Sequence, residues 1–145
     1  MGYTLEDLCA DSRKSLKSKP GYEGRDEVRQ HLEKILCDEE FVASHCGPNA
    51  EIGKHRLYSD PELGFTVINF VSPAGRVESP PHDHADSWAI YGQVTMHTAM
   101  RDWERGDPKS DGTEGDIKPV KSYNLEPGQA HLYDVGDIHS IHPAD

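Results

Sequence analysis

Three histidines, His82, His84 and His139, have the residue type and spacing best suited to metal chemistry in this chain. Imidazole is the commonest side-chain ligand for metals in proteins. Side chains two residues apart in a strand point to the same side, so the first two imidazoles could reach one ion. Two surface histidines at the start of a strand would give the same pattern, so the pair by itself does not distinguish the two interpretations.

The segment that ends at His139 strengthens the metal hypothesis because it resembles the second motif of the cupin family. That motif consists of a glycine, five residues, usually a proline, one residue, a second glycine, two residues and a histidine. Residues 128–139 match it, with Asp134 where the proline is usual. The resemblance implies a cupin fold, a small double-stranded β-helix or jelly-roll barrel, and implies that His139 is the last metal ligand.

The first cupin motif is recognisable around His82 and His84, with one informative departure. Most cupins carry a metal-binding glutamate four or five residues after the histidine pair. Those positions here are Trp88 and Ala89, and neither side chain can ligate a metal. The resemblance therefore implies a site made of three histidines.

An all-histidine site has consequences for the metal and the substrate. Three neutral ligands leave the charge of a divalent ion uncompensated and up to three coordination positions open, which favours an anionic, chelating substrate. Fe(II) is the metal that the resemblance favours. Zinc, nickel, manganese and copper stay open, because imidazole suits several of these ions.

Within the cupins, the segment from His82 to Ser87, HDHADS, is similar to the HDHxxS segment of cysteine dioxygenases and related thiol dioxygenases. In that branch an arginine on an earlier strand binds the substrate carboxylate, and Arg56 occupies the matching place. The cysteine that cysteine dioxygenases link to a tyrosine is replaced here by Ala89. The resemblance thus implies a relative that oxidises a small carboxylate-bearing thiol rather than a cysteine dioxygenase itself.

A second resemblance is to small bacterial cupins with the pattern HDHxxSWAIYGQ, some of which are 4-hydroxylaminobenzoate lyases that form a dihydroxybenzoate and ammonia. It implies that Arg56 pairs with an aromatic carboxylate while Trp88 or Tyr91 stacks on the ring. Core packing in the barrel would also explain the two aromatic residues, and Arg56 could be a solvated strand residue. A non-enzymatic cupin that binds a metal or a small molecule stays open as well, because one fold hosts many functions.

The elements that must position these residues follow from periodicity and turn residues. We predict one mostly β domain over residues 1–145, with two or three helices in 4–46 and the barrel in 54–145. Thr4 followed by Asp7 predicts a helix N-terminus. The predicted strands are 54–58, 65–71, 87–100, 117–124 and 131–135, with a loop over 104–116. Because cupins continue past the last motif, we expect further strands beyond residue 145.

Composition limits the partners. The net charge of -11 argues against nucleic acid and anionic membrane surfaces as partners. The first residues lack the layout of a signal peptide, so we expect a cytoplasmic protein. Cys9, Cys37 and Cys46 show no metal-binding spacing, and we expect reduced thiols, with Cys9 and Cys37 on apolar helix faces. Pairing through barrel edges would make a homodimer.

Overall fold

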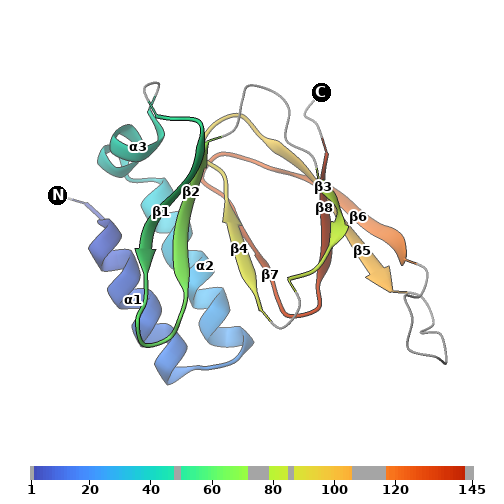
Figure 1. Cartoon of the computed structure of the whole chain (residues 1–145), viewed down its shortest axis with the longest axis horizontal. Coiled ribbons are helices and arrows are strands. Elements are labelled where there is room, and N and C mark those ends of the chain that lie inside the picture. The colour runs from blue at the N-terminus through green and yellow to red at the C-terminus, as the bar shows by residue number, and fades with distance from the viewer. Residues whose placement is uncertain (1, 48–49, 72–78, 85–86, 106–116, 143–145) are drawn as a thin grey trace.

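A computed structural model describes residues 2–47, 50–71, 79–84, 87–105 and 117–142 (Figure 1). Three helices come first along the chain and strands follow, which confirms the mostly β prediction with N-terminal helices. The helices are α1 (Leu5–Ser18), α2 (Tyr22–Leu36) and α3 (Glu39–Cys46). The strands are β1 (Gly53–Ser59), β2 (Thr66–Val71), β3 (Ser79–His82), β4 (Ala89–Gly92), β5 (Thr98–Arg105), β6 (Ile117–Leu125), β7 (Ala130–Tyr133) and β8 (Ile138–His142).

The strands form three antiparallel sheets. β1 pairs with β2, β4 pairs with β7, and a four-stranded sheet has the order β3-β8-β5-β6. Within the described part of the chain these sheets remain open and do not close into the expected barrel. The helices lie on the side of the β1–β2 and β4–β7 pairs, and the four-stranded sheet lies farther from them (Figure 1).

The predicted strand 87–100 is wrong, because two strands in different sheets replace it. β4 ends at Gly92 and pairs with β7, whereas β5 begins at Thr98 and pairs with β6 and β8. Between them Met96 has a φ of 58°, in the left-handed region that turns the chain. β3 and β8 are absent from the predicted strands; at β3, Pro80 and Pro81 argue against a strand. Of the predicted loop, residues 106–116 lie outside the described residues.

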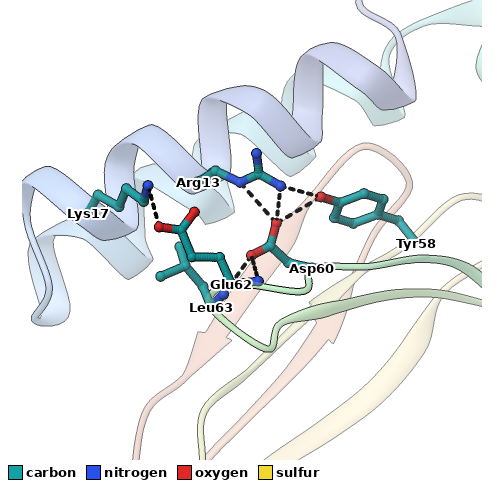
Figure 2. Close-up of polar contacts among 6 residues, drawn as sticks. All are labelled: Arg13, Lys17, Tyr58, Asp60, Glu62 and Leu63. Atoms are coloured by element: carbon teal, nitrogen blue, oxygen red, sulfur yellow. Dashed lines mark hydrogen bonds and ion pairs between the residues drawn. The ribbon is translucent and has the colours of Figure 1, made fainter.

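Local signals explain the start of α1 and its attachment. Thr4 and Asp7 form the predicted capping box, each side chain accepting a hydrogen bond from the other's backbone nitrogen. Farther along the helix, Arg13 donates to the buried carboxylate of Asp60 in the turn after β1 (Figure 2). The Tyr58 hydroxyl also donates to Asp60, at 2.7 Å. This cluster fastens α1 to the β1–β2 hairpin.

Helix α2 covers the β4–β7 pair. A Cβ at Gly92 would lie 2.8 Å from Leu36 Cδ1 and 3.0 Å from Leu32 Cδ2, so the helix approaches this strand closely. The Glu33 carboxylate accepts a hydrogen bond from the backbone nitrogen of Ala130 at 2.9 Å. Because neighbouring side chains alternate between faces, the residues next to Gly92 and Ala130 point away from the helix. Tyr91 and His131 thus face the other way, toward the four-stranded sheet.

Apolar and aromatic side chains fill the space between these two sheets. Met100, Leu125 and Tyr133 form a buried cluster, and Tyr91, Tyr123 and Ile141 pack against it. The histidine site packs against this core.

The cysteine predictions were right in part. All three cysteines are free, and Cys9 is buried on α1 as predicted. Cys37 is exposed, which corrects its predicted burial: it follows the last turn of α2 as the C-cap residue. None of the helices in the described ranges is both long and apolar enough to span a membrane.

Candidate metal centre

The pairing of β3 with β8 brings the two sequence motifs together. His82 ends β3 and is the register partner of His139 in β8. His84 lies two residues beyond the end of β3, so the expected strand alternation is not what orients it. The structure nevertheless brings all three predicted ligands together.

The ring nitrogens converge on one point. Nε2 of His139 lies 3.1 Å from Nε2 of His82 and 3.2 Å from Nε2 of His84. One ligand atom from each of the three histidines lies within 4.8 Å of the others. Nitrogens about 2.1 Å from a common ion are separated by about 3.0–3.4 Å at octahedral to tetrahedral angles. The three imidazoles therefore fit a single transition-metal ion.

Hydrogen bonding prepares at least one imidazole for this role. Nδ1 of His82 lies 2.8 Å from the carbonyl oxygen of Pro80. A carbonyl oxygen only accepts, so Nδ1 carries the proton and Nε2 presents a lone pair toward His139. This arrangement is typical of metal-binding histidines, whose second nitrogen donates to a nearby acceptor.

Burial and mutual repulsion keep the site neutral. His139 is fully buried, and burial together with the neighbouring His82 and His84 lowers its pKa to about 4. Burial and the proximity of His82 also lower the pKa of His84. A metal competes poorly with protons for an imidazole, so a lowered pKa leaves these nitrogens free for an ion near neutral pH. A divalent cation would offset the repulsion between the nitrogen lone pairs that face one another here.

Two tyrosines form an aromatic wall against His139. The Tyr133 ring lies 3.8 Å from the imidazole between ring centroids, and the Tyr91 ring lies 5.0 Å from it, edge to face. Tyr91 also lies 6.1 Å from His84. Among the described residues the Tyr91 hydroxyl has no hydrogen-bond partner. Because burial raises its pKa, it remains a protonated donor beside the histidines.

A chain of hydroxyl groups lies behind this wall. The Tyr123 hydroxyl is 2.5 Å from the Tyr133 hydroxyl and donates to Oδ1 of Asp102 at 2.9 Å. His131 stacks on Tyr123, with ring centroids 5.1 Å apart. Sequence reasoning missed Asp102, Tyr123 and Tyr133 as members of the site. Strand alternation could have placed Tyr133 on the same side as His131, but nothing in the sequence shows that β7 lies against the sheet that contains β5 and β6.

The other predicted site residues lie farther out or have no described link to the site. Arg56 is exposed on β1, in the separate two-stranded sheet, opposite Ile68. Trp88 is half-buried directly before β4. Carboxylate binding by Arg56 and ring stacking by Trp88 therefore stay predictions.

Asp134 and His142 lie close to His139 in the sequence and make other contacts. Asp134, which replaces the usual cupin proline, forms an ion pair with Arg25 of α2 and accepts a hydrogen bond from the backbone of Val135. His142 contacts the Ser140 hydroxyl at 2.8 Å. The departure from the cupin motif at Asp134 therefore ties α2 to the loop before β8.

The site is thus a partly buried three-histidine group that could bind a metal ion, in a sheet-rich fold compatible with a cupin. No protein-family model matches the chain, and a search of curated proteins finds no significant similarity to any of them.

Proposed function

We propose that this protein is a metal-dependent enzyme of the cupin type, with one Fe(II) ion held by His82, His84 and His139. The convergence of three Nε2 atoms is the observation that carries the proposal. Fe(II) bound by three imidazoles would supply an open, positively charged centre for substrate binding and oxygen chemistry.

The substrate proposed is a small thiol that carries a carboxylate, as for the thiol dioxygenases. The charge balance supports an anion, because the ligand group identified in the described chain contains no carboxylate. A thiolate is a soft anionic donor that would offset the charge of the ion. Arg56 is the residue proposed to bind the carboxylate, from its place in the resemblance.

Tyr91 is proposed to touch the bound substrate. Its hydroxyl is a protonated donor, and its ring lies edge-on to His139. A donor at this position would orient a negatively charged substrate group. Trp88 precedes the same strand and is proposed as a second aromatic contact.

The aromatic wall supports a second candidate, a lyase that converts a hydroxylaminobenzoate and water to a dihydroxybenzoate and ammonia. Tyr91 and Tyr133 lie side by side at the histidines, with ring centroids 5.4 Å apart. Aromatic side chains suit the binding of an aromatic ring. In this reaction the metal would act as a Lewis acid on the N–OH group.

Oxygen dependence separates the two candidates. Iron-loaded protein that is a thiol dioxygenase consumes oxygen with cysteine or 3-mercaptopropionate. Protein that is the lyase releases ammonia from 4-hydroxylaminobenzoate without oxygen. If metal-replete protein does neither, the enzymatic proposals fail and a metal-binding module remains.

The variant His139→Gln tests the metal site itself. It should lose bound metal and activity, as measured by metal analysis after gel filtration. His55→Gln is the matched control, because within the described residues the hydrogen bond of the His55 imidazole is to the backbone carbonyl oxygen of Glu51, away from the site. Equal metal content in the two variants would contradict the proposed ligand set.

A further inference from the structure

A chain of hydrogen bonds runs from Asp102 and Tyr123 in the four-stranded sheet to Tyr133 in β7, whose ring contacts His139. Tyr123 has one hydroxyl proton, and it donates that proton to the carboxylate of Asp102 at 2.9 Å. A carboxylate in this role only accepts. The 2.5 Å contact between Tyr123 and Tyr133 must therefore use the proton of Tyr133. Asp102 thus sets the direction of both hydrogen bonds.

The ring of Tyr133, whose hydroxyl is held by these hydrogen bonds, packs directly against His139. Tyr133 is 2% exposed, and its ring centroid lies 3.8 Å from that of the imidazole. His131 lies against the same tyrosine at 4.5 Å, and Tyr91 lies at 5.4 Å. With its hydroxyl held and its ring enclosed, Tyr133 has little freedom to move.

His139 lacks the feature that usually orients a metal-binding histidine. Its Nδ1 is buried and has no hydrogen-bond partner within the described structure. Ligand histidines almost always donate from this second nitrogen to a carboxylate, a carbonyl or water, which fixes the ring. By contrast, His82 has such a partner in Pro80. In place of such a hydrogen bond at Nδ1, the His139 ring has the contact with the Tyr133 ring to restrain it.

We propose that Asp102 and Tyr123 are positioning residues of the metal centre, because they hold Tyr133 against His139 and so restrain an imidazole whose Nδ1 has no hydrogen-bond partner among the described residues. Register supports this assignment, since Asp102 lies directly opposite His139 in the β5–β8 ladder. The inference rests on the proposed metal site and adds the device that orients its most buried ligand.

Variants of the chain distinguish a positioning role from a structural one. Tyr123→Phe keeps the ring that stacks on His131 and removes both hydrogen bonds. Asp102→Asn keeps an acceptor oxygen, whereas Asp102→Ala does not. We expect Tyr123→Phe and Asp102→Ala to weaken Co(II) binding about 10- to 100-fold, the usual cost of losing an outer-shell partner. Asp102→Asn should stay close to the parent protein.

The absorption spectrum of the Co(II)-loaded protein distinguishes the two roles. It would not change if Asp102 and Tyr123 only stabilised the fold. It reports the geometry of the ligands, so it should change in Tyr123→Phe and Asp102→Ala. Tyr58→Phe is the matched control, because Tyr58 lies in the separate β1–β2 sheet and donates to Asp60 in the turn after β1. That variant should lose stability and keep both the parent affinity and the parent spectrum.

A readout in metal-free protein separates this inference from the proposed metal site. Nitrogen-15 NMR of the His139 ring should show one fixed orientation in the parent and averaging in Tyr123→Phe. Folded Tyr123→Phe with unchanged His139 signals, Co(II) affinity and spectrum would overturn the positioning role alone. Parent protein that binds no Co(II) would instead overturn the proposed metal site.

Discussion

The Tyr91 ring meets the His139 imidazole edge to face, 5.0 Å between centroids and 67° between planes. The hydroxyl of Tyr133, the other tyrosine against His139, is committed to Tyr123, while that of Tyr91 has no partner in the described chain. Tyr91 is therefore the tyrosine whose proton can reach a molecule bound at the histidines.

Tyr91→Phe removes that donor and leaves the ring in place. We expect normal metal content and a kcat/KM about 10- to 150-fold lower, since a hydrogen bond to a charged group contributes about 1.5–3 kcal/mol. Steady-state kinetics on the substrate that shows turnover, together with metal analysis, checks this. Tyr22→Phe is the control, because Tyr22 is 62% exposed on α2. An unchanged kcat/KM for Tyr91→Phe would remove Tyr91 from the substrate contacts.

Metal binding should stabilise the fold, because the ligands come from β3, from the residues after it and from β8. A ligand that binds only the folded state at 100 times its dissociation constant adds about 2.7 kcal/mol. We expect thermal unfolding of metal-free protein to shift upward by roughly 5–10 °C when the metal is added. Chelation should reverse the shift. His82→Gln should abolish it, and a shift of the same size in that variant would contradict the ligand assignment.

Asp60 should make stability depend on acid pH. Burial opposes ionisation of this carboxyl, but hydrogen bonds from the Leu63 backbone, Arg13 and Tyr58 outweigh it and hold the pKa well below its ordinary 3.8. The folded state therefore binds a proton less readily than the unfolded state. The stabilisation is complete above about pH 3.8 and is lost as the pH falls below that value.

Asp60→Asn tests this linkage. The variant should be less stable at neutral pH, and the difference from the parent should shrink as the pH falls below 3.8. Urea unfolding at a series of pH values measures both effects. A difference that stays constant down to pH 2 would show that the charge of Asp60 does not stabilise the fold.

Gly24 permits the close contact between α1 and α2. A Cβ there would lie 1.9 Å from the Lys19 carbonyl oxygen and 2.8 Å from that of Ser15, both backbone atoms that cannot turn aside. We expect Gly24→Ala to destabilise the protein by about 1–3 kcal/mol, the usual cost of overpacking. Gly21→Ala is the control, since a Cβ at Gly21 meets nothing within 4 Å. Equal stability of the two variants in urea unfolding would contradict this packing.

Local sequence signals predicted a good part of the fold. The capping box at Thr4 and Asp7 gave the start of α1, and alternation gave β1 and β2 nearly to the residue. The same reasoning failed at residues 87–100, where apolar residues continue although the chain changes sheets near Met96. Periodicity reports which face is buried and not which strand lies alongside, so it could not detect this crossing.

The sequence alone picked out His82, His84 and His139 as candidate metal ligands, from a histidine pair and from the resemblance of residues 128–139 to the second cupin motif. Only the tertiary structure decided how they are oriented. It pairs β3 with β8, brings Tyr91 and Tyr133 against His139, and lets Asp102 act through Tyr123. Such contacts join residues far apart in the chain, and their hydrogen bonds depend on distances of a few ångströms that no local pattern encodes.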